Sequence, residues 1–182
     1  MLHKRKANRM IGYDYTQDNL YFVTSCVKNR VCCFGEIISQ KMVLNEYGKI
    51  AEKQWHWLGQ RYSYLRLHQF VVMPDHIHGI IEINRSHVFV GTGRDPSLQK
   101  HQHNESIKPI KIKSLSELMG AYKTTTSKQI HLLGFDSFAW QRSFHDHIIR
   151  DEKSFISISN YIATNPIKGE TNHLIDNIEI SP

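Results

Sequence analysis

The sequence lacks any apolar run of the length that a membrane-spanning helix needs, about 18 residues or more. Its basic N-terminus, MLHKRKANRM, leads into a polar stretch, whereas a signal peptide would continue into an apolar core. We therefore expect a cytoplasmic protein that is not exported and does not cross a membrane.

Cysteine is also scarce. The chain has three, Cys26, Cys32 and Cys33, and none of them forms a C-x-x-C pair. An odd number without that spacing argues against a disulfide framework. We expect buried free thiols in a reducing compartment and assign Cys32 and Cys33 a structural role.

No internal repeat divides the 182 residues, and hydrophobic residues make up 40% of them. This is enough apolar material for a core, so the chain should be folded rather than disordered. The length fits a single domain spanning 1–182. Within this domain, residues 84–113 form a polar stretch that is unusually long for a connection, and we expect it to be a surface loop.

Positive charge and histidine are both abundant. The net charge is +6, the pI is about 9.2 and the chain has 12 histidines. A basic balance favours an anionic partner, of which nucleic acid is the commonest large one. The histidines make metal chemistry worth seeking.

Hydrophobic periodicity and turn residues divide the chain into seven elements. A Pro74-Asp75 turn separates two strands as a hairpin, Ser114 with Glu117 forms a capping box, and Pro166 ends the last helix. The expected strands are residues 20–28, 64–73, 76–83 and 138–149. The expected helices are residues 39–62, 114–133 and 151–164.

The resulting order, β-α-β-β-α-β-α, predicts an α+β fold. Its first six elements form the ferredoxin-like split βαβ pattern, an antiparallel sheet with two helices on one face. The last helix is an addition to that pattern.

Two histidines in HIHGIIEI are placed for joint metal binding. Alternate residues of a strand share a face, so His76 and His78 should point together, away from the two main helices. Two imidazoles at this spacing can bind one metal ion, although a solvated histidine pair is the plainer interpretation. His145 and His147 have the same spacing, so context has to distinguish the pairs.

The last predicted helix supplies that context. Tyr161 and Asn165 lie four residues apart and therefore share one helix face. At the helix end, the Asn165 amide can project toward a metal, and tyrosine can act as a covalent nucleophile. Without the histidines, Tyr161 would be read as a half-buried packing residue.

Three strings in this order, VVMPDHIHGIIEI, WQRSFHDHIIRDEKSF and NYIATNPIKGE, resemble the HUH single-tyrosine transposases, most of all their REP-associated branch. The resemblance covers most of residues 20–168. In that family a His-hydrophobic-His strand follows a Pro-Asp or Pro-Glu turn. A Trp-Gln signature follows later, and a final helix carries Tyr, Asn and Pro. The signature preceding that helix falls here on Trp140, Gln141, Arg142, His147 and Arg150.

The resemblance implies a mechanism as well as a fold. His76, His78 and Asn165 would hold Mg²⁺ or Mn²⁺, and Tyr161 would attack single-stranded DNA, often near a hairpin. The tyrosine would keep the 5′ side of the cut and leave a free 3′-OH, and reversal with another 3′-OH would join strands without ATP. In relatives the tyrosine helix packs in cis or onto a partner, so a monomer and a homodimer both stay open.

Several residues have weaker claims. Tyr122 is the rival nucleophile, but it lacks a metal-ligand partner four residues on, so we read it as a packing or DNA-contacting residue. Lys123 and Lys128 could contact phosphates, although exposed helical lysines are usually only solvated. Trp140 could stack on a base, although a core position is the commoner role.

Two alternatives to the transposase reading remain. One is a non-catalytic module of the same fold that binds a DNA or RNA hairpin. The other is a zinc hydrolase in which His145 or His147 joins His76 and His78, because zinc sites usually need three strong protein ligands.

Overall fold

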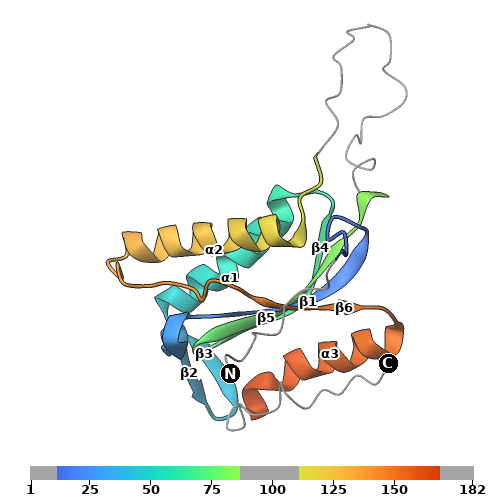
Figure 1. The fold of residues 1–182 in the computed structure, drawn as a ribbon. Coiled ribbons are helices and arrows are strands. Elements are labelled where there is room, and N and C mark those ends of the chain that lie inside the picture. The colour runs from blue at the N-terminus through green and yellow to red at the C-terminus, as the bar shows by residue number, and fades with distance from the viewer. Residues whose placement is uncertain (1–11, 87–110, 169–182) are drawn as a thin grey trace, which may run out of the picture.

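The computed structural model describes residues 12–86 and 111–168, which form one main sheet with helices on both faces (Figure 1). The antiparallel strands follow the order β4-β5-β1-β6. Helices α1 and α2 cover one face and α3 covers the other. This confirms the α+β, ferredoxin-like prediction with an added last helix. The strands are β1 (Asn19–Cys26), β4 (Leu65–Met73), β5 (His76–Ile83) and β6 (His145–Ile149); the helices are α1 (Glu46–Arg61), α2 (Leu115–Leu132) and α3 (Glu152–Thr164).

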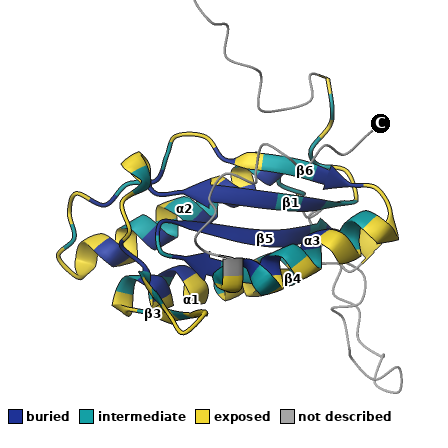
Figure 2. Cartoon of the chain, turned by 90° about the horizontal axis from the view of Figure 1, so that it is seen from below, coloured by how far each residue is buried: buried dark blue, intermediate teal, exposed yellow. Residues whose placement is uncertain are grey.

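Strand β5 lies between β4 and β1 and is buried along nearly its whole length (Figure 2). Alternation sends its side chains to two different layers. Gly79 meets Trp55 of α1, whereas His78 meets Tyr161 of α3. The histidines therefore lie on the face opposite the two main helices, as the pattern predicted.

The two faces bury two separate hydrophobic clusters. The larger lies under α1 and α2 and is rich in aromatic rings, with Trp55 stacked on Phe70 at 4.5 Å between ring centroids. The smaller lies under α3 and consists of Ile80, Ile149, Ile158 and Ile162. Helix α3 is thus held on the sheet by its own apolar contact.

Each helix begins at a side chain that satisfies free backbone N–H groups. Asn45 accepts from the Gly48 amide, and Asp151 accepts from the Ser154 amide. Ser114 and Glu117 form the complete predicted capping box before α2. These caps explain why α2 and α3 begin within one residue of their predicted starts.

A hairpin replaces the first part of the helix that was predicted from residue 39, and that prediction is wrong there. Strands β2 (Gly35–Ile38) and β3 (Lys41–Leu44) form a separate two-stranded sheet. Ser39 and Gln40 make its turn with φ of 49° and 62°, a left-handed conformation more often supplied by glycine or asparagine. Helix α1 begins only after Asn45.

The strand predicted over 138–149 is also shorter than expected, because β6 spans only its last five residues, His145–Ile149. The preceding segment docks on the end of β1: Trp140 forms an isolated bridge with Val27, and the Gln141 amide donates to the Cys26 carbonyl at 2.8 Å. Strand β1 itself ends at Cys26, before a short 3-10 turn, Lys28–Arg30.

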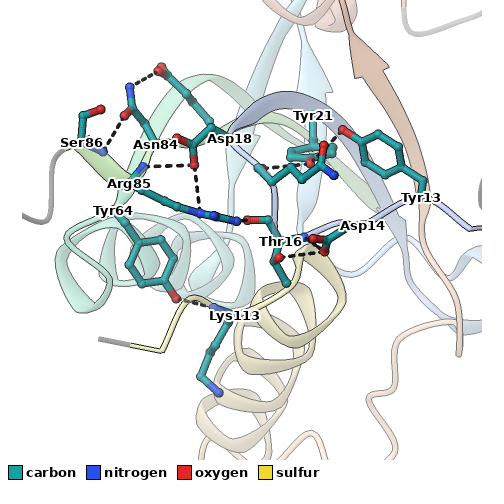
Figure 3. A network of polar contacts seen from close by, with 12 residues as sticks. Tyr13, Asp14, Thr16, Asp18, Tyr21, Tyr64, Asn84, Arg85, Ser86 and Lys113 are labelled. Carbon is teal, nitrogen blue, oxygen red and sulfur yellow. Dashed lines mark hydrogen bonds and ion pairs between the residues drawn. The ribbon is translucent and has the colours of Figure 1, made fainter. Parts of the chain in front are cut away.

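Polar contacts join four separate segments at the opposite end of the sheet (Figure 3). Arg85 pairs with Asp18 and donates to the Thr16 carbonyl at 2.7 Å, while the Lys113 amide donates to the Tyr64 hydroxyl at 3.1 Å. These contacts fix the chain on either side of the predicted loop at 84–113. Residues 87–110 of that loop lie outside the described part.

Among the described residues, no helix has the length and apolar character needed to cross a membrane.

We predict that Gly79→Ala destabilises the protein by about 1–3 kcal/mol, the usual cost of overpacking a core. An added Cβ would lie 2.4 Å from Cζ2 of Trp55, whose ring is held by its stack on Phe70. The free energy of unfolding in urea measures the effect. The control is Gly120→Ala on the exposed side of α2, where a Cβ meets nothing within 4 Å. It should be neutral or stabilising by up to about 1 kcal/mol. Equal effects at the two sites would contradict the packing account.

Candidate active site

The centre of the candidate site is a buried pair of imidazole rings. His76 and His78 are 3% and 1% exposed, and their Nε2 atoms lie 3.1 Å apart. Strand alternation gives the rings their common face, and pairing of β5 with β4 and β1 fixes the backbone beneath them. The two Nε2 atoms thus face each other within hydrogen-bonding distance.

The remaining nitrogen of each ring has a partner of its own. Nδ1 of His76 lies 2.5 Å from Oδ1 of Asp75, and Nδ1 of His78 lies 2.8 Å from Oγ1 of Thr24. Burial, with the nearby His76 ring and Arg30, lowers the pKa of His78 well below its usual range. A neutral imidazole is the form that binds metal ions.

Helix α3 brings the predicted nucleophile to this pair. The Tyr161 hydroxyl lies 3.4 Å from Nε2 of His78, and its ring meets Phe22 edge to face at 6.2 Å. Ile158 and Ile162, on the same helix, pack on the sheet. In this single chain the tyrosine therefore lies over the sheet, beside the histidine pair.

Asn165 follows one turn later. It is only 8% exposed and continues α3 with helical backbone angles. Along α3, Phe155 contacts His68 and Tyr161 contacts His78, so the helix advances toward the end of β5 that carries His76. Asn165 therefore lies farther in that direction, on the helix side that Tyr161 occupies.

The two histidines fit a shared divalent ion. Two nitrogen ligands about 2.1 Å from an ion, at right angles, lie about 3.0 Å apart, close to the separation of the two Nε2 atoms. Within 12–86 and 111–168, no three His, Cys, Asp or Glu side chains form a metal-binding group. Asn165 is the third ligand that the sequence predicted, and its amide oxygen is a group of another kind.

The second histidine pair does not complete this site. His145 and His147 lie on β6, and β1 separates β6 from β5. No zinc-type group of three ligands is present in the described residues. The zinc-hydrolase alternative therefore lacks its third histidine.

The rival nucleophile and the tryptophan belong to the core. Tyr122 is fully buried on the α1 and α2 side, its hydroxyl donates to the Ala51 carbonyl at 3.1 Å, and burial strongly raises its pKa. Trp140 packs on Phe34 and Phe138 in the same cluster. The packing interpretations of Tyr122 and Trp140 are thus confirmed.

The Lys123 side chain forms hydrogen bonds with backbone carbonyl groups. Its Nζ donates to the Gln141 carbonyl at 2.5 Å and lies within 3.5 Å of two following carbonyls, and burial lowers its pKa. It fastens the segment before β6 to α2. Lys128 is exposed, as is Arg142 of the predicted signature.

A basic groove runs between α2 and the segment before β6, with a volume of about 750 Å³. Lys128 and Arg142 supply its exposed cations, Thr124 and Ser127 supply hydroxyls, and no acidic side chain lines it. Leu132, Phe138 and Trp140 also line it, and its cations and hydroxyls are groups that contact phosphates. The segment beside it bonds to the end of β1 that pairs with His76.

Sequence reasoning missed the residues that support the histidine pair. Asp75 was read only as a turn residue, and neither Thr24 nor Arg30 was singled out. Arg30 contacts Asp75 through Nε at 2.8 Å and Cys26 through Nη1 at 2.9 Å. The three cysteines are free, as expected, but Cys32 is exposed rather than buried.

This fold is similar to that of a solved transposase. A REP-associated tyrosine transposase bound to a REP hairpin matches with a TM-score of 0.55 and 18% identity, over 88% of this chain and 74% of that one. A candidate transposase from Deinococcus radiodurans R1 matches at a TM-score of 0.42 and 15% identity, over 85% of this chain and 95% of that one; this likeness supports no further argument.

At the level of sequence, the chain is 36% identical over 174 residues to an uncharacterized protein of Haemophilus influenzae strain Rd, covering 95% of this chain and 94% of that protein. The chain belongs to the same family as this Haemophilus protein. Comparison with protein-family models gives no match.

Proposed function

We propose that the protein is a metal-dependent enzyme that cleaves and rejoins single-stranded DNA through Tyr161, in the manner of the HUH single-tyrosine transposases. The observation that carries this proposal is the meeting of three groups from β5 and α3. The Tyr161 hydroxyl lies 3.4 Å from Nε2 of His78, which lies 3.1 Å from Nε2 of His76.

The proposed step is a transfer of one phosphodiester linkage. The Tyr161 oxygen forms a bond to phosphorus, and the bond from phosphorus to the 3′ oxygen breaks. The phenol loses its proton and the departing 3′ oxygen gains one. The 5′ phosphate stays on the tyrosine, so a later 3′-OH can reverse the step without an energy source.

The divalent ion, Mg²⁺ or Mn²⁺, would be held by His76, His78 and Asn165. When bound, such an ion polarises the phosphate and neutralises the charge that develops on it. The protein residues supply orientation: the buried histidines hold the ligand position, and the α3 cluster holds Tyr161 beside it. This fixed approach is what nucleophilic catalysis requires.

A DNA partner is supported by charge and by the groove. The net charge is +6, and Lys128 and Arg142 face a groove without acidic residues. The structurally similar transposase was solved with a REP hairpin, so we infer hairpin or single-stranded DNA as the ligand here. A module of this fold that binds a DNA or RNA hairpin without cutting it is the alternative that the experiments below separate.

We predict that Tyr161→Phe abolishes cleavage and the covalent protein–DNA adduct while sparing DNA binding. Only the hydroxyl is lost, so the ring contact with Phe22 persists. A denaturing gel with an oligonucleotide labelled on the 3′ side of the cut measures the adduct.

The control is Tyr122→Phe, which removes a core hydrogen bond worth about 1 kcal/mol and should keep both activities. If Tyr161→Phe still forms the adduct, the nucleophile assignment is wrong. If the wild type cleaves without an adduct, tyrosine chemistry fails. If the wild type binds a hairpin but never cleaves it, the result supports the alternative of a non-catalytic binding module.

We also predict that cleavage requires Mg²⁺ or Mn²⁺ and that His76→Ala and His78→Ala each abolish it. Each substitution removes one of the two facing nitrogens. His145→Ala should retain most activity, because β6 lies beyond β1. Cleavage assays with and without chelator measure this, with circular dichroism as the test of folding. Equal loss at His145 would contradict the assignment.

DNA binding should weaken steeply as salt rises, and the basic groove should account for part of that dependence. Lys128→Glu and Arg142→Glu should each lower affinity and reduce the slope of log affinity against log salt by about 1. Fluorescence anisotropy with a labelled hairpin, without metal, measures both. The matched control is Lys53→Glu on the exposed side of α1, in a pocket that also holds Glu52. Equal weakening at Lys53 would mean that binding is not localised to the groove.

A further inference from the structure

A series of polar contacts leads away from the candidate metal site, from the buried His76 and Asp75 to the partly exposed Arg30. Oδ1 of Asp75 lies 2.5 Å from Nδ1 of His76, and Oδ2 of the same carboxyl lies 2.8 Å from Nε of Arg30. Asp75 is 7% exposed. Arg30 also donates to the Cys26 sulfur at 2.9 Å, which anchors the guanidinium at a second point.

The donor and the acceptor of each of these hydrogen bonds can be assigned. A carboxylate paired with a guanidinium only accepts hydrogen bonds, so Nδ1 of His76 must carry the proton between them. Nε2 is then the nitrogen of that ring left to bind a metal ion, and it is the atom that faces His78. His78 is held differently, because the Thr24 hydroxyl at its Nδ1 can either donate or accept.

The backbone around these residues is arranged to keep them in place. The Val27 amide donates to the Asp75 carbonyl at 2.8 Å, and the amides of Cys33 and Phe34 donate to the Pro74 carbonyl at 2.8 and 3.0 Å. Three backbone hydrogen bonds therefore join the turn that contains Asp75 to the segment that contains Arg30.

Arg30 reaches Asp75 from an uncommon backbone conformation. Asn29 and Arg30 have φ of 57° and 56°, in the left-handed region that few residues other than glycine adopt. Such conformations persist where surrounding contacts hold them, and they gather at functional sites. Here those contacts include the two that the Arg30 side chain makes with Asp75 and Cys26, and the bond from the Arg30 amide to the Val27 carbonyl at 3.0 Å.

We propose that Asp75 and Arg30 are positioning residues that hold His76 as the Nδ1-protonated tautomer, with Nε2 turned toward the metal ion it would share with His78. This inference rests on the proposed function and extends it to the support of one ligand. A carboxylate behind a ligating histidine fixes the ring and strengthens its basicity.

The first test needs no metal and no activity. Long-range ¹H–¹⁵N correlation spectra of the ¹⁵N-histidine-labelled full chain report which ring nitrogen of His76 is protonated. We expect Nδ1 in the wild type and a mixture of tautomers in Asp75→Ala. Asp75→Asn should disturb the Nδ1 protonation as well, because its single amide oxygen cannot accept from both Nε of Arg30 and Nδ1 of His76. An unchanged His76 signal in Asp75→Ala would overturn the proposal.

The second test is Mn²⁺ affinity by calorimetry without DNA. Asp75→Ala and Arg30→Ala should weaken binding by about 10–100-fold, and Arg30→Lys should recover part of the loss. The matched control is Asp18→Ala, which breaks the half-exposed ion pair with Arg85 far from the histidines. It should leave Mn²⁺ affinity unchanged.

The outcomes separate this inference from the proposed function. A wild type that binds Mn²⁺ and cleaves DNA, with Asp75→Ala and Arg30→Ala keeping their Mn²⁺ affinity, overturns the positioning role alone. A wild type that binds no Mn²⁺ overturns the metal part of both proposals. If Asp75→Ala does not fold, Asp75→Asn and Arg30→Ala decide, since each leaves more of the buried network in place.

Discussion

A patch of isoleucine side chains between α3 and the sheet determines where the candidate nucleophile lies. Ile158 and Ile162 of the helix pack on Ile80 and Ile149 of the strands. Burying side chains of this size contributes about 1.5–3 kcal/mol each, so the contact can hold a helix that follows the ferredoxin-like pattern. Tyr161, next to Ile162 in the chain, is carried with the helix to His78.

Burial of the histidine pair adds a second constraint. A buried polar group without a partner costs free energy, so every ring nitrogen under α3 needs one. Asp75 and Thr24 meet the two Nδ1 atoms, and the two Nε2 atoms meet each other. The arrangement of the two rings is therefore fixed by the protein alone, because α3 and the strands remove the rings from water.

The sequence-based predictions were most accurate where they rested on local patterns. Alternation in HIHGIIEI gave the bounds of β5 and the face of His76 and His78, and the capping box gave the start of α2. The hairpin at 35–44 was not predicted, because Ser39 and Gln40 make its turn without glycine. The role of Arg30 was not predicted for a different reason. Arg30 and Asp75 lie far apart in the sequence, and no local pattern at either residue indicates their contact.

The two rival tyrosines show why placement decides function more than residue type does. Tyr122 lies under α1 and α2, where its hydroxyl is tied to the Ala51 carbonyl and burial raises its pKa. Tyr161 lies on the other face, with its hydroxyl toward an imidazole nitrogen. Helix α2 and helix α3 lie on opposite faces of the sheet, so the sheet itself keeps Tyr122 away from His76 and His78. The fold likeness at 18% identity fixes only the architecture; the chemistry open to each side chain depends on which face of that sheet it occupies.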